Sequence, residues 1–136
     1  MNEVIEKRIT TEQLVSELSQ CIGTEHWYRH NLNRHLIYSD GVKLLAECGG
    51  HGGAYWFLDK IACEIFPLLK AKNESFLFIT LSVDHETTAL VSVTDGNNKK
   101  LASFNLSYTD MQQGDWRFYL IDDGDENKKL IVPSEY

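Results

Sequence analysis

The second half of the chain alternates apolar and polar residues over several short stretches, and this feature constrains the fold most. In residues 76–83 every second position is apolar, from Leu77 through Ile79 and Leu81 to Val83. The strands expected from this alternation are 76–83, 88–94, 101–108, 116–121 and 129–132. Because successive side chains of a strand face opposite sides, the pattern is typical of antiparallel strands with one buried face and one wetter face.

Two segments of the first half have the period of an amphipathic helix. In residues 11–22 the apolar side chains fall on one narrow face, and Thr10 with Gln13 forms a capping-box pattern at the start. Residues 54–66 are apolar over about half of a helical circumference, and Pro67 is expected to end this helix. Both segments are predicted to pack on the sheet.

The segment between these helices predicts a β-hairpin. Residues 35–38 and 42–47 flank Ser39, Asp40 and Gly41, a combination typical of tight turns. Gly41 is therefore expected in a left-handed conformation. A glycine-rich loop, residues 48–53, would then lead into the second helix.

Together these elements predict an α+β fold, with two helices packed on one face of an antiparallel sheet of roughly five to seven strands. A chain of 136 residues fits one domain, residues 1–136, and has enough apolar surface for a core without disulfides.

The charge balance argues against nucleic acid as a partner. The chain has 13 basic and 20 acidic residues, a formal net charge of −7, whereas a nucleic-acid footprint needs a basic face. Three cysteines, no signal-peptide pattern and no apolar run long enough to span a membrane favour a reducing, cytoplasmic location. Oligomeric state and partner identity are left open by the sequence.

The best candidate for a binding surface is a polar and aromatic segment without clear periodicity, joined by residues from its neighbours. Interleaved aromatic and charged side chains are common at binding surfaces, although such rings also serve to complete a core. The candidate binding residues are Trp27, Tyr28, Arg29, His30, Asp40, Lys43, Trp56 and Asp59. The function expected is a small non-enzymatic binding or regulatory module that recognises a protein partner.

An enzyme is the alternative. Its site would use His30 as a general base, with Asp40 and Asp59 orienting the imidazole. A pocket that encloses His30 beside a buried carboxylate would favour this alternative, whereas stoichiometric capture of one protein would favour the binding module.

No cofactor or metal is expected. Cys48 and His51 form a Cys-x-x-His pair that His26, His30 or His35 could extend, but no second pair with zinc-ligand spacing accompanies it. The glycines around this pair lack the spacing of known phosphate-binding loops, and a turn between two elements explains them.

Several short motifs resemble an uncharacterised domain-of-unknown-function family of small bacterial proteins, often associated with phages and mobile elements. The motifs are Gly23-Thr24-Glu25, Tyr28-Arg29-His30, Tyr38 to Lys43, Ala54-Tyr55-Trp56 and Pro133 to Tyr136. The resemblance implies a bacterial, cytoplasmic single-domain protein and carries no established activity. The residues themselves also predict a docked C-terminus: a strand at 130–132 carries the end to the surface and Pro133 stops its ladder. The Tyr136 ring is expected to be buried, with Arg29 or Lys43 meeting the charges of Glu135 and the terminal carboxylate.

The absence of a zinc-ligand pattern gives a first testable prediction. Purified protein should contain less than one zinc per chain, and its melting temperature should not change when EDTA is added. One bound zinc per chain, lost together with stability on chelation, would contradict the prediction.

Overall fold

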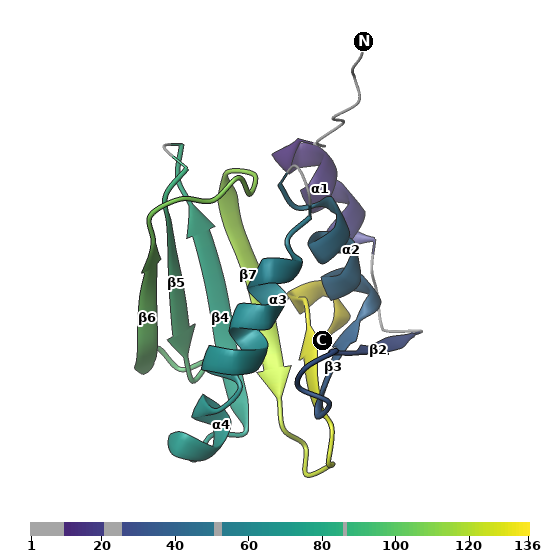
Figure 1. Cartoon of the computed structure of the whole chain (residues 1–136), viewed down its shortest axis with the longest axis vertical. Helices are drawn as coiled ribbons and strands as arrows, with labels where there is room; N and C mark the ends of the chain where they lie inside the picture. Colours follow the sequence, from purple (N-terminus) through teal and green to yellow (C-terminus); the bar gives the residue numbers. More distant parts are fainter. Residues whose placement is uncertain (1–9, 21–25, 51–52, 86) are drawn as a thin grey trace.

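The computed structural model describes residues 10–20, 26–50, 53–85 and 87–136 of the chain. A seven-stranded sheet crosses it in the order β2-β3-β8-β7-β4-β5-β6 (Figure 1). The strands are β2 Trp27–Arg29, β3 Leu36–Ser39, β4 Phe76–Val83, β5 Ala89–Thr94, β6 Lys100–Leu106, β7 Gly114–Ile121 and β8 Lys128–Ile131. Neighbouring strands are antiparallel except for the parallel pair β3–β8. The predicted α+β class and antiparallel sheet are confirmed, and β2 is a strand that the sequence did not predict.

The helical segments lie mainly on one side of this sheet, with α1 and α2 near one end of the strands and α4 near the other (Figure 1). They are α1 Thr11–Ser19, α2 Asp40–Cys48, α3 Tyr55–Lys60, the π-helical turn η1 Ile61–Ile65, and α4 Leu68–Ala71. The predicted capping box is present at α1, because Thr10 Oγ1 accepts from Gln13 N–H and Gln13 Oε1 accepts from Thr10 N–H. Cys21, Ile22 and Gly23, which were expected to complete this helix and its stop, lie outside the described residues.

The predicted hairpin around Gly41 is wrong, because the chain enters helix α2 there. Ser39 is the N-cap of this helix, and its hydroxyl accepts a hydrogen bond from Val42 N–H at 3.3 Å. Val42, Leu45 and Ala46 are buried at the spacing of one helical face. Gly41 is helical and is not among the glycines with positive φ. Serine followed by an acid suits a helix start as well as a turn, and here the helical burial pattern decides between the two.

The second predicted helix is present but changes its winding halfway. After α3, the Phe66 N–H donates to the Ile61 carbonyl at 2.7 Å, five residues back, as in a π-helix. The helix ends at Ile65, directly before Phe66 and Pro67, as predicted. Pro67 then stands at the N-cap of a further short helix, α4, where a missing N–H has no cost.

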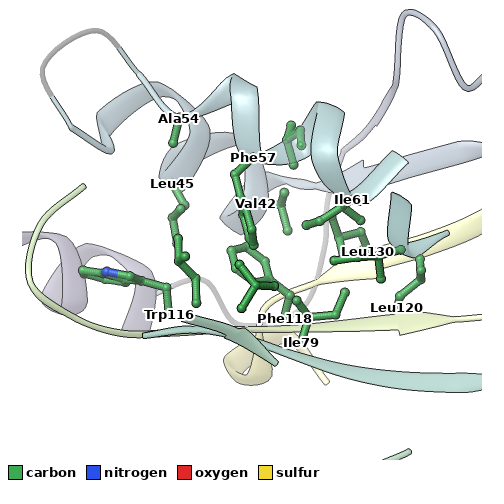
Figure 2. Packing of buried hydrophobic residues seen from close by; sticks show 14 of the residues in the cluster. Val42, Leu45, Ala54, Phe57, Ile61, Ile79, Trp116, Phe118, Leu120 and Leu130 are labelled. Atoms are coloured by element: carbon green, nitrogen blue, oxygen red, sulfur yellow. The ribbon is translucent and has the colours of Figure 1, made fainter. Parts of the chain in front are cut away.

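The core lies between the helices and the alternating side chains of the sheet. Phe57 of α3 contacts Phe118 of β7, with ring centroids 5.4 Å apart. Figure 2 shows Val42, Leu45 and Ile61 pointing from the helices towards the strands. In β4 every second residue is buried, as the alternation predicts. The opposite face of the sheet carries half-buried aromatic rings, including Phe76, Phe78 and Tyr119.

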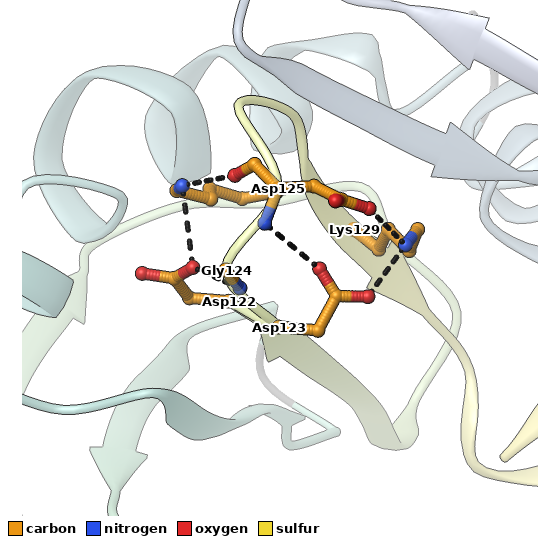
Figure 3. A network of polar contacts seen from close by, with 6 residues as sticks. Asp122, Asp123, Gly124, Asp125 and Lys129 are labelled. Carbon is orange, nitrogen blue, oxygen red and sulfur yellow. Dashed lines mark hydrogen bonds and ion pairs between the residues drawn. The ribbon is translucent and has the colours of Figure 1, made fainter.

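The acidic segment after β7 is a turn whose carboxylates pair with lysines at the start of β8, as Figure 3 shows. Lys129 Nζ lies 2.6 Å from Asp123 and 3.4 Å from Asp125. Asp122 accepts from Gly124 N–H, and this bond, together with Lys128, lowers the pKa of its carboxyl. The carboxylates therefore serve the β7–β8 connection.

The C-terminal residues dock onto the fold, but by contacts other than those expected. In the 3₁₀ turn η2, Pro133–Glu135, Ser134 Oγ donates to the Leu18 carbonyl at 3.0 Å. The Glu135 carboxylate contacts the start of α2 and not Arg29 or Lys43. The expected burial of Tyr136 is wrong, because its side chain is 79% exposed and only touches the edges of Tyr119 and Phe76.

Gly41 allows the close approach of this C-terminal turn to α2. A Cβ at this position would lie 2.7 Å from Val132 Cγ2 and 2.9 Å from Glu135 Oε1. Gly41→Ala should therefore destabilise the protein by about 1–3 kcal/mol through overpacking, although alanine is the better helix former. Urea denaturation measures this change.

The background variant Val132→Ala supplies the control. It removes the methyl group that the new Cβ would meet, so Gly41→Ala should cost less in this background. Stabilisation by Gly41→Ala in the wild-type background, as at an open helical position, would contradict the prediction.

Candidate functional site

Strand β2 places the aromatic and basic residues of the candidate surface on two different sides. Tyr28 faces the same side as Tyr38 of β3, with ring centroids 5.8 Å apart. Trp27 and Arg29 alternate to the other side, and Arg29 donates to the Arg34 carbonyl and to Asn127 Oδ1. Trp27 is 41% exposed. The predicted patch is therefore divided by the strand itself.

Tyr28, Asp40 and Lys43 do come together, between β2 and the first turn of α2. The Tyr28 hydroxyl donates to Asp40 Oδ1 at 3.1 Å, and Asp40 Oδ2 also accepts from His26 N–H. Lys43 Nζ lies 5.2 Å from the centroid of the Tyr28 ring and pairs with Glu47 one helical turn later. This geometry holds the Asp40 carboxylate, the Lys43 ammonium group and the Tyr28 phenol together at the surface.

These contacts shift the ionisation of the cluster in a consistent direction. Burial, followed by the hydrogen bond to Asp40, raises the pKa of Tyr28. The contact with Glu47 raises the pKa of Lys43. Both shifts keep the protons on these groups, so at neutral pH the cluster holds a neutral phenol and a cationic lysine.

His30 is buried, with 4% of its surface exposed, and both ring nitrogens are engaged. Nδ1 accepts from the N–H groups of Leu32 and Asn33 at 3.1 and 3.0 Å. Nε2 therefore carries the proton and faces Asp59 Oδ1 at 2.8 Å. The imidazole organises residues 31–35 and joins this segment to α3.

The π-helical turn contributes to the same attachment. Asn33 Nδ2 donates to the carbonyl of Ala62 at 3.1 Å, within η1. The widened winding of the π turn leaves carbonyl groups available for such partners. Asn33 is thus held from both sides, by His30 through its backbone and by η1 through its side chain.

Helix α3 presents two exposed aromatic rings beside these clusters. Tyr55 is 42% exposed and Trp56 is 36% exposed. Tyr55 lies close enough to Lys43 and Tyr38 to affect the pKa of both groups. Asp59 follows Tyr55 by one helical turn, so both side chains occupy the same side of the helix. Tyr55 was not among the predicted binding residues. Its place at the first position of the predicted helix is the sequence signal that could have indicated its exposure.

We name the surface formed by Tyr28, Lys43, Tyr55, Trp56 and Asp59 the α3 surface. Of the predicted residues it includes four and excludes Trp27 and Arg29, which lie on the other side of β2. The remaining two predicted residues hold members of this surface in place: His30 is hydrogen-bonded to Asp59, and Asp40 accepts from Tyr28.

The glycine-rich loop is partly occupied by an internal contact. Gly50 N–H donates to Gln112 Oε1 at 2.9 Å, and Gln112 Nε2 donates to the Cys48 carbonyl. His51 lies outside the described residues. Within the described ranges, no three histidine, cysteine or acidic side chains group as metal ligands, and no helix has the length and apolarity needed to cross a membrane.

The fold and these clusters define a class: an α+β protein whose sheet is covered on one face by helices that expose an aromatic and charged surface. Residues 12–136 match the family of unknown function DUF6876, and the chain belongs to this family. No curated protein and no solved structure matches this chain significantly.

The two ring nitrogens of His30 give a prediction about stability. His30→Ala should destabilise the protein by about 1–3 kcal/mol, because two partly buried N–H groups lose their acceptor. His30→Asn places an oxygen near the Nδ1 position and should cost least, whereas His30→Gln retains only the contact to Asp59 and should be intermediate. Urea denaturation of the three variants gives the order.

An equal loss in the asparagine and alanine variants would contradict this assignment. It would show that the contact to Asp59, which is 60% exposed, matters more than the two backbone donors.

Proposed function

We propose that this protein is a non-enzymatic binding module that recognises a protein partner through the α3 surface. The observation that carries the proposal is the exposure of Tyr55 and Trp56 beside charges that internal contacts hold in place. Tyrosine and tryptophan are enriched at the centres of protein interfaces, where their rings contribute most of the binding energy. Lys43 and Asp59 supply one charge of each sign for orientation.

The geometry of His30 supports a binding module over the alternative acid–base enzyme. A general base needs a nitrogen that faces a substrate, and both nitrogens of His30 are hydrogen-bonded within the fold. The described contacts of Asp40 go to Tyr28 and His26, so this carboxylate serves a different cluster. The polar groups that resemble a catalytic set are thus used to build the surface.

The cellular setting belongs to the same proposal. The family resemblance supports a bacterial protein associated with phages or mobile elements. Cys48 and Cys63 are free thiols, and Cys63 is exposed, which supports a reducing cytoplasmic location.

Affinity capture tests this function. The full chain, immobilised by a tag, should retain one protein in stoichiometric amount from a lysate of its source organism. The double variant Tyr55→Ala, Trp56→Ala should lower the affinity for that protein at least about tenfold, because central aromatic residues carry interface energy. Titration by calorimetry with the identified protein measures the change.

Leu90→Ala is the matched control. Leu90 is 39% exposed, similar to Tyr55 and Trp56, but it lies on the opposite face of the sheet. Equal affinities for wild type, control and double variant would contradict the role of the α3 surface.

A further inference from the structure

Strand β6 forms one free edge of the sheet. In the described part of the chain it pairs with β5 alone, and Figure 1 shows it as the outermost strand. An edge strand presents a row of backbone N–H and C=O groups to any strand that approaches. The other edge, β2, has three residues, whereas β6 has seven.

This edge lacks the features that usually prevent pairing with another chain. Its only charged residue is Lys100, at the first position, and it contains no proline. The single irregularity in its register lies at the same end, where Val93 and Thr94 pair with Ala102 and Lys100. From Ala102 to Leu106 the register is regular and no side chain is charged, which suits the strand to pairing with another strand.

The apolar side chains of β6 also have an uncovered side. Ala102, Phe104 and Leu106 face the helical layer, opposite the buried residues Val93, Val91 and Ala89 of β5. They are nevertheless only half-buried, because no described strand continues the sheet beyond them. Lys60 of α3 extends over the Phe104 ring, with Nζ 4.8 Å from its centroid. One more strand would cover these side chains.

We propose that β6 is a homodimer interface, in which β6 of two copies pair antiparallel about a two-fold axis at Phe104. In this register Phe104 faces its own counterpart, Ala102 faces the partner's Leu106, and Ser103 faces the partner's Asn105. Aromatic and apolar cross-strand pairs of this kind stabilise antiparallel sheets.

The pairing pattern is the reason for choosing a second copy over a strand of another protein. From Ala102 to Leu106, each side chain meets one of its own kind in the two-fold image, apolar with apolar and polar with polar. Lys100 lies towards the partner's Tyr108, a ring that is 70% exposed in the single chain. No like charges face each other along the strand, although each copy carries a formal net charge of −7. The seven-stranded sheet would then continue into that of the second copy.

Two charge variants test both the interface and its register. Ser103 and Asn105 are exposed in the single chain, on the face away from the helices. Ser103→Glu with Asn105→Glu places two pairs of like charges across the proposed axis and should weaken dimerisation at least tenfold. Ser103→Glu with Asn105→Lys places opposite charges across it and should keep the dimer. Analytical ultracentrifugation gives the masses, and circular dichroism checks that both variants are folded.

The wild type should sediment at twice the chain mass of 15.6 kDa. Its amides in residues 100–106 should exchange more slowly as the concentration rises, and those of β2 should not change. This measurement on the wild type stands even where a charge variant fails to fold. A monomeric wild type, an unchanged dimer in the doubly acidic variant, or concentration-independent exchange in β6 would overturn the proposal. Loss of the dimer in the Glu–Lys variant would overturn the register at Phe104.

Discussion

The arrangement of helix α2 on the sheet depends on one carboxylate at the end of the chain. Glu135 accepts from the hydroxyl of Ser39 at 2.5 Å and from the N–H groups of Gly41 and Val132, each at 3.0 Å. A carboxylate is favourable at a helix N-terminus, where the first N–H groups lack partners within the helix. The segment after β8 is thereby joined to the β3–α2 junction, which lies 94 residues earlier when counted from Glu135 to Gly41.

This junction explains features that would otherwise be unrelated. Gly41 has no side chain because Glu135 and Val132 occupy the space where one would lie. Ser39 donates to Glu135 and accepts from Val42, so a single hydroxyl both caps α2 and ties it to the C-terminus. With its first turn held in this way, α2 places Asp40 and Lys43 against the Tyr28 ring. The position of Lys43 in the α3 surface thus depends on the contacts that Glu135 makes with the start of α2.

The sequence predicts the sheet well because its information is local. In β4 each alternate residue of 76–83 is buried, and the strand has the boundaries that the alternation indicates. The capping box at Thr10 is likewise an interaction within four residues. A period of two, or a cap three residues from its partner, can be recognised without any knowledge of the tertiary structure.

The errors fall where distant residues decide the conformation. Ser39, Asp40 and Gly41 suit a turn on local grounds, and the bond to Glu135, 94 residues beyond Gly41, holds the helix start in place. Strand β2 has three residues and exists by pairing with β3, so its own sequence shows no alternation long enough to recognise. Tyr28, Lys43 and Asp59 of the candidate surface all belong to the α3 surface, whereas the division made by β2 could be recognised only with knowledge of that strand.

Hydrogen bonding and exposure divide the residues of the candidate site into two groups, those used within the fold and those open to solvent. His30 is buried with both nitrogens bonded, and a buried polar group in this state has no capacity left for a ligand. Tyr55 and Trp56 differ, because more than a third of each side chain is open to solvent while the helix beneath them is anchored by Phe57 in the core. Rings held on a rigid helix lose little entropy when a partner covers them. In the proposed binding function, the buried histidine would act indirectly, because it fixes Asp59 and the loop beside the rings that a partner would contact.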